Sequence, residues 1–123
     1  MIKFFEKEIE EDIFYVGEIV EWKQVDGKVR IVVALDEFPG ETFIWARRIS
    51  ALRGSAFHTF CEGMGLVNHK EQLVLERLDK DEKVMAALNK MPDGRYLVRE
   101  MYWESDWEEN EDSYEYDADD FDE

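Results

Sequence analysis

Basic and aromatic side chains interleave over two stretches of the sequence, and they are the residues best suited to chemistry. They are Lys23, Lys28, Arg30, Phe43, Trp45, Arg47, Arg48 and Arg53. This combination binds single strands without reading their sequence, because every base offers a ring to stack on and every phosphate a charge to neutralise. Two simpler interpretations stay open. Trp45 is equally suited to a buried core, and Lys23 and Arg30 to a solvated face that compensates Glu21.

Other kinds of site find little support in the residue pattern. His58 and Cys61 lie one helical turn apart, but zinc needs three or four protein ligands and only His69 remains as a further soft donor. Cys61 stands among apolar residues, which indicates an inert buried thiol. The carboxylates are too numerous to single out an acid–base pair, and no phosphate-binding glycine motif is present. We therefore predict a protein that is not an enzyme and uses no metal or cofactor.

A β-hairpin is expected to position the first basic cluster. Segments 13–24 and 28–35 are rich in β-branched and aromatic residues, and Asp26-Gly27 between them is a strong signal for a tight turn. With these two loop residues, the register pairs Lys23 with Arg30, Trp22 with Ile31, Glu21 with Val32 and Val20 with Val33. The face predicted to be core holds Val20, Trp22, Val29, Ile31, Val33 and Leu35. The opposite face carries the three basic residues of the hairpin.

The remaining elements complete a mainly β fold. After the turn at Pro39-Gly40, a third strand over 42–49 places Phe43, Trp45 and Arg47 on one face, and Arg48 stands near its end. A short helix follows over 55–65, capped by Ser55 and stopped by Gly65. Segment 72–78 is predicted as a fourth strand, 79–91 as an amphipathic helix and 95–102 as a fifth strand. The expected architecture is a five-stranded β-barrel with one or two short helices.

The charge distribution divides the chain into a domain over 1–103 and a tail over 104–123. The net charge is −16, but twelve of the 31 acidic residues and none of the 15 basic ones lie in the last twenty positions. The preceding part therefore carries only −4. The tail lacks Leu, Ile and Val and its carboxylates repel one another, so we expect it to be disordered. Its aromatic residues suit a partner-binding role, and they are Trp107, Tyr114, Tyr116 and Phe121.

The sequence also bears on the compartment. Cys61 is the only cysteine, so no internal disulfide forms, and acidic residues near the N-terminus occupy the place of a secretory apolar segment. No uncharged apolar run approaches the eighteen or so residues that span a bilayer. A cytoplasmic protein without membrane contact is therefore expected.

Four segments together resemble the small phage-type single-stranded-DNA-binding proteins. They are GEIVEWKQVDGKVRIVVAL, TFIWARRIS, SAFHTFCEGMGL and DGRYLVREMYW, within about residues 13 to 103. The resemblance implies an oligonucleotide-binding (OB) fold, a Greek-key barrel that binds single strands across strands 2 and 3.

The tail is a second and independent match. Proteins of this class, from bacteria and phages, carry acidic tails with a terminal or near-terminal Phe, and these tails recruit replication or recombination proteins and compete with DNA. Asp119-Asp120-Phe121-Asp122-Glu123 is similar, although Phe121 is not the last residue. The resemblance thus implies a protein of a phage or mobile element whose partners are single-stranded DNA and replication or recombination proteins.

Two other functions remain open. An acidic inhibitor that imitates DNA would bind the basic cleft of a nuclease or restriction enzyme through its carboxylates, although such a protein should spread its acidity over the folded surface. An accessory protein that binds only protein partners is the other. The sequence does not determine the oligomeric state, so a homodimer also stays open.

Overall fold

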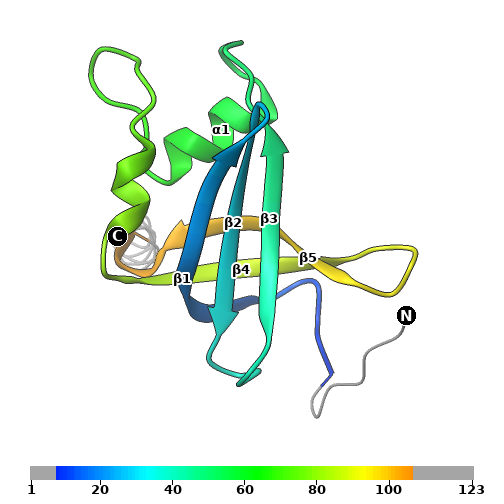
Figure 1. The fold of residues 1–123 in the computed structure, drawn as a ribbon. Helices are drawn as coiled ribbons and strands as arrows, with labels where there is room; N and C mark the ends of the chain where they lie inside the picture. The colour runs from blue at the N-terminus through cyan, green and yellow to red at the C-terminus, as the bar shows by residue number, and fades with distance from the viewer. Residues whose placement is uncertain (1–7, 107–123) are drawn as a thin grey trace, which may run out of the picture.

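The computed structural model describes residues 8–106, and they form a mainly β fold (Figure 1). The strands are β1 (Phe14–Val25), β2 (Lys28–Leu35), β3 (Thr42–Arg48), β4 (Lys83–Lys90) and β5 (Tyr96–Trp103), and the helices are α1 (Ala56–Gly63) and the 3₁₀ helix η1 (Leu75–Asp79). The strands close into a barrel in the order β1-β2-β3-β5-β4. A five-stranded closed barrel of this kind is OB-like, as expected.

The predicted hairpin is confirmed, with one correction to its register. Asp26 and Gly27 have φ values of 51° and 74°, the left-handed pair that a type I′ turn requires. Lys23 lies opposite Arg30, as expected, but Ile19 rather than Val20 pairs with Val33. A β-bulge between Ile19 and Glu21 takes Val20 out of the register and leaves it 59% exposed. The sequence pattern does not reveal such an inserted residue.

The inward faces of the strands build one hydrophobic core. Four of the six hairpin residues predicted to be core are buried, namely Val29, Ile31, Val33 and Leu35. Trp22 is half-buried, and its indole Nε1 donates to Asp79 Oδ1 at 2.7 Å at the edge of η1. Phe43 and Trp45 of β3 join the same core. The inward face of the hairpin and of β3 thus holds the barrel together.

The barrel closes unevenly. β4 pairs antiparallel with both β1 and β5, whereas β3 and β5 pair in parallel at Ile44 and Leu97 alone. Beyond this contact the two strands diverge. Figure 1 shows β1, β2 and β3 side by side, with β4 and β5 crossing behind them and α1 at the end of the barrel where β3 finishes.

Two predicted elements are wrong, although the number of strands is right. The expected helix over 79–91 is strand β4, and the expected strand over 72–78 contains η1 and one isolated bridge between Val67 and Leu73. Val84 and Leu88 share a face in both a helix and a strand, and both are buried on the barrel side of β4. Tertiary pairing decided between the two structures.

The short helix α1 begins and ends as predicted. Ser55 is its N-cap, and its Oγ accepts a hydrogen bond from the backbone N–H of His58 at 3.1 Å. Gly65, just past the helix, has φ 69°, which suits glycine. The indole Nε1 of Trp103 donates to the carbonyl oxygen of Met64 at 2.7 Å. This bond ties the end of β5 to the turn after α1.

Only the first residues of the predicted tail fall within the described range. Residues 104–106 form a helical turn, in which the hydroxyl of Ser105 donates to Glu82 at 3.1 Å. The prediction of disorder is therefore wrong for these three residues. The aromatic residues Trp107, Tyr114, Tyr116 and Phe121 lie outside the described residues. Within 8–106, no helix has the length and apolar character needed to cross a membrane.

Candidate nucleic-acid interface

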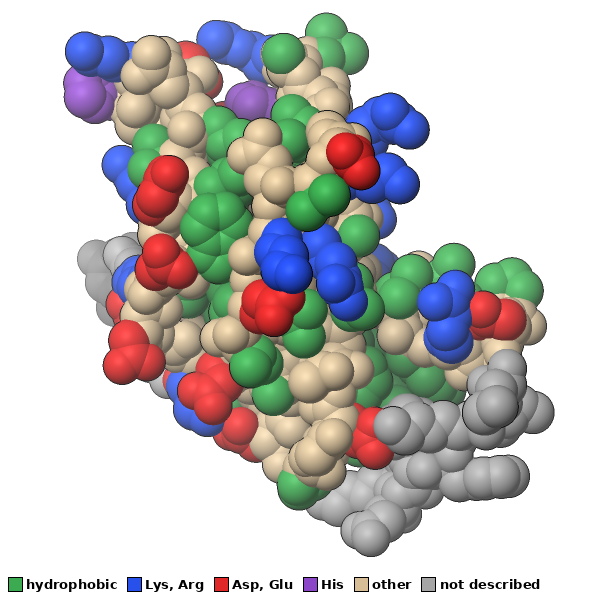
Figure 2. All heavy atoms as spheres, viewed as in Figure 1, with side chains coloured by type: hydrophobic (Ala, Val, Ile, Leu, Met, Phe, Trp, Pro, Cys, Tyr) green, Lys and Arg blue, Asp and Glu red, His purple; other side chains and the backbone are tan. Residues whose placement is uncertain are grey.

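Four basic side chains gather on the outward surface of β1, β2 and β3. They are Lys23, Lys28, Arg30 and Arg48, here called the cationic face, and all four are exposed. The register places them in two adjacent rows: Lys23 opposite Arg30, and Lys28 opposite Arg48. Figure 2 shows Lys and Arg side chains at the centre and upper right of this view, and others at its upper left and right, while Asp and Glu are most frequent along its left and lower edges.

The cationic face is poorly compensated. Lys23 lies 3.8 Å from Glu21, but among the described residues no carboxylate forms an ion pair with Lys28, Arg30 or Arg48. Like charges directly opposite each other across two strands destabilise a sheet. The two like-charge pairs therefore lower folding stability. The chain contains 31 acidic residues, so the lack of partners does not come from a shortage of carboxylates.

The two aromatic residues expected at the interface lie in the core. Phe43 is 4% exposed and Trp45 is 1% exposed, so neither ring can stack on a base in this structure. Phe60 of α1 covers Trp45, with ring centroids 3.8 Å apart and an interplanar angle of 18°. The alternative interpretation of Trp45 as a core residue is the one that the structure shows.

The two other predicted arginines lie beside the cationic face rather than on it. Arg47 has the inward parity of Trp45, but it stands near the end of β3, where it is exposed and its guanidinium lies 5.8 Å from the Trp45 ring. Arg53, in the loop before α1, lies 3.9 Å from Glu71. Arg47 can extend the cationic face, whereas the charge of Arg53 is partly compensated.

A groove opens between β3, β5 and α1. It has a volume of about 290 Å³. Its lining includes Arg47 of β3, Phe60 of α1, and Arg99, Glu100 and Tyr102 of β5. The last four were not singled out from the sequence, because the groove depends on the single pairing between β3 and β5. Their aromatic and charged character was visible, but nothing in the sequence placed them together.

A scan against family models and searches of curated proteins and of solved structures found no match to this chain.

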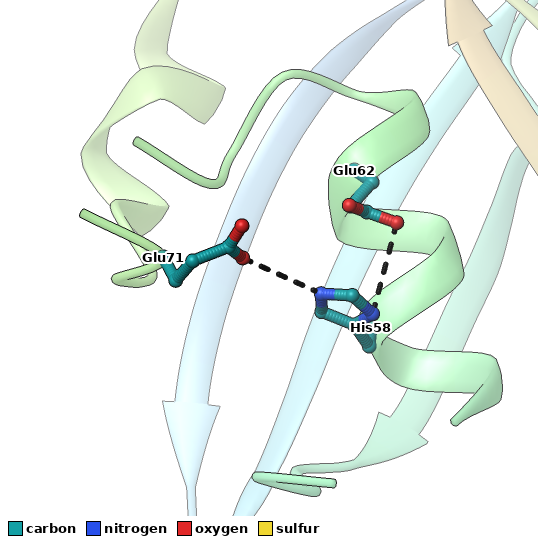
Figure 3. A group of neighbouring side chains, drawn as sticks. All are labelled: His58, Glu62 and Glu71. Carbon is teal, nitrogen blue, oxygen red and sulfur yellow. Dashed lines mark ion pairs between the residues drawn. The ribbon is translucent and has the colours of Figure 1, made fainter. Parts of the chain in front are cut away.

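A second cluster combines one histidine and two glutamates. His58, Glu62 and Glu71 bring one ligand atom each within 4.8 Å of one another, with the imidazole between the two carboxylates (Figure 3). His58 Nδ1 accepts a hydrogen bond from the backbone N–H of Gly54 at 2.9 Å. A neutral imidazole then carries its proton on Nε2, 4.0 Å from Glu71.

This hydrogen bond bears on metal binding. A metal bound to Nε2 would require the imidazole proton to be on Nδ1. Nδ1 could then no longer accept the hydrogen bond from the Gly54 N–H. The arrangement thus serves better to fasten the loop before α1 to the helix than to hold a cation. Cys61, the other ligand considered from the sequence, is buried and does not belong to this cluster of described residues.

Proposed function

We propose that this protein is a non-enzymatic single-stranded-DNA-binding protein of a phage or mobile element, which binds without reading the sequence. One observation carries the proposal: strands β1 to β3 of an OB-like barrel carry two cross-strand pairs of like charge. Three of these four cations form no ion pair with the described residues. Because this arrangement destabilises the sheet, stability does not account for it. Strands 2 and 3 of OB folds commonly bind oligonucleotides.

Phosphates are the chemical partners that such a surface fits best. Lys28, Arg30 and Arg48 are exposed donors without a protein acceptor among the described residues, so a phosphate can bind them without breaking an ion pair. Neutralising phosphates releases condensed counterions from the strand, which supplies most of the affinity in binding that does not depend on sequence.

The tail has a regulatory place in this proposal. Residues 107–123 contain ten carboxylates and no basic residue. A tethered polyanion competes with DNA for a basic surface at an effective concentration that reaches the millimolar range for short tethers. When DNA displaces it, the tail becomes available to replication or recombination proteins, with Trp107, Tyr114, Tyr116 and Phe121 as its apolar contacts.

Fluorescence anisotropy with a labelled thirty-nucleotide poly-dT strand at low salt tests the proposal. The test variant replaces Lys28, Arg30 and Arg48 with Gln. The matched control replaces Lys80, Lys83 and Arg95, which already pair with Glu82, Asp36 and Asp93. Both variants lose three positive charges, so a difference between them reports the position of the charges.

We expect the test variant to lose at least tenfold in affinity and the control to lose much less, with circular dichroism showing that both are folded. Equal losses would mean that only net charge matters. Absence of binding by the unmodified protein would refute the proposal.

The acidity of the described residues favours one second candidate, an inhibitor that imitates DNA. Residues 8–106 carry a net charge of −7, and Figure 2 shows Asp and Glu side chains along the left and lower edges of the view. A row of carboxylates can occupy the basic cleft of a nuclease. Inhibition of a nuclease by a protein that does not itself bind DNA would support this candidate over the first.

A further inference from the structure

The groove between β3 and β5 adjoins the cationic face. Arg47 lines the groove, and its chain neighbour Arg48 belongs to the face. Successive residues of a β-strand point to opposite faces, so a single strand of DNA that follows the cationic face to the end of β3 bends around that end to reach the groove. Its volume of about 290 Å³ stands at the lower end of the range for small-molecule pockets, which suits a single base better than a larger ligand.

The walls of the groove suit a planar ring. Phe60 is half-buried, and one face of its ring stacks on Trp45. This stacking holds the ring in a fixed orientation. Tyr102 lines the groove from β5, and its ring packs closely against Gly63 at the end of α1. An alanine at position 63 would bring its Cβ to 3.2 Å from that ring. Aromatic surfaces of this kind contribute about 1–3 kcal/mol for each stacked base.

A single carboxylate stands among these groove walls. Glu100 lies near the Tyr102 hydroxyl, and its Oε2 lies 3.5 Å from Arg99 Nε. Burial, followed by the nearby charge of Glu100, raises the pKa of Tyr102 above its ordinary value. An ionised carboxylate has about four acceptor sites, which leaves some free after both contacts. Glu100 is thus a positioned acceptor with no donor capacity of its own.

We propose that the groove receives one base of the bound single strand and that Glu100 favours bases with an exocyclic amino group over thymine. This inference rests on the proposed function. Cytosine offers an amino donor at the position where thymine has a carbonyl oxygen, which a carboxylate repels. The protein then binds every single strand through phosphate contacts, with a modest preference superimposed at one nucleotide.

Anisotropy titrations of the full chain with (dC)₂₀ and (dT)₂₀ test the inference. We expect tighter binding of (dC)₂₀ by about two- to tenfold, the effect of one hydrogen bond. In Glu100→Gln the preference should fall to about one, because an amide can rotate to donate to the thymine oxygen. Tyr102→Phe should also reduce it, since the ring remains but Glu100 loses the hydroxyl. Glu76→Gln, an equal charge change outside the groove lining, should keep it.

The outcomes separate this inference from the proposed function. Equal affinity for the two strands, or a preference that survives in Glu100→Gln, would overturn the base groove while leaving the cationic face intact. Failure to bind either strand would refute the proposed function and the groove with it. Loss of the preference in Glu76→Gln would attribute it to net charge, which also overturns the inference.

Discussion

At the scale of single residues, burial decides which side chains can meet a ligand. The basic residues of the hairpin could be placed on the outward face from the two-residue turn and strand parity alone, and the structure places Lys23, Lys28 and Arg30 there. The aromatic residues could not be assigned in the same way. Parity put Phe43 and Trp45 on one face, but whether that face is inward depends on how β3 closes against β5, which is a long-range contact. Phe60 and Tyr102 were missed for the same reason.

Replacing Trp45 with Ala should destabilise the fold rather than act on DNA binding directly. The side chain is 1% exposed and stacks on Phe60. Its removal therefore leaves a cavity and removes the stacking contact of Phe60. We expect a loss of about 3–5 kcal/mol in the free energy of unfolding, measured by urea denaturation. Arg47→Ala removes only the guanidinium that lies 5.8 Å from this ring, so it should lower the free energy of unfolding by about 1 kcal/mol or less. A Trp45→Ala protein of unchanged stability would place the ring outside the core.

Cys61 should be unreactive in the folded protein. Burial raises the pKa of its thiol to about 11, so little thiolate exists near pH 8. We expect very slow modification by a thiol reagent at pH 8 and rapid modification in urea. The native state also holds this proton more tightly than the unfolded chain, whose thiol titrates near 9.0. The contribution of Cys61 to stability is therefore complete below pH 9 and lost as the pH rises towards 11. Rapid labelling without denaturant would contradict this account.

At the scale of the elements, local turn chemistry was more informative than periodicity. Asp26-Gly27 fixed the turn and the pairing near it, and Ser55 and Gly65 bounded α1. Strand β4 was mistaken for a helix because Ala, Leu, Lys and Met are good helix formers and because Val84 and Leu88 fit both periods. Ala86 shares the buried face of the strand with these two residues, but alanine is common in helices and does not indicate a strand.

The like-charge pairs across β2 and β3 imply a conflict between stability and binding. Lys28→Glu would place a carboxylate directly opposite Arg48, replacing a repulsive pair with an attractive one. We expect the free energy of unfolding to rise by about 0.2–1 kcal/mol while affinity for poly-dT falls. Thermal unfolding and anisotropy on the same sample measure both. Lys28→Gln is the matched control, which should show a smaller change in each. A variant that binds as tightly as the unmodified protein would exclude Lys28 from the interface.

At the scale of the whole molecule, charge is segregated along the chain. The last twenty residues contain twelve of the 31 carboxylates, and the cationic face stands on a barrel whose described residues carry a net charge of −7. The sequence could predict this segregation, because it depends only on counting. It could not predict the groove, which arises where β3, α1 and β5 meet, segments that are distant in sequence.

Deleting residues 107–123 should tighten binding to single-stranded DNA. The deletion removes ten carboxylates and keeps the described barrel, including the bond between Ser105 and Glu82. Salt screens the competition, so the gain should be largest at low ionic strength, where the Debye length is long. Titrations of both proteins at about 0.02 M and 0.2 M salt measure it. A deletion that weakens binding, or a gain that is independent of salt, would contradict competition by the tail.

The salt dependence of poly-dT affinity is the most direct test of the cationic face. On a single strand each phosphate contact contributes about −0.7 to the slope of log affinity against log salt. Replacing Lys28, Arg30 and Arg48 with Gln should therefore reduce the magnitude of the slope by about 2 relative to the unmodified protein. An unchanged slope would show that these residues do not contact phosphate. No measurable binding by the unmodified protein, even at low salt, would contradict the account as a whole.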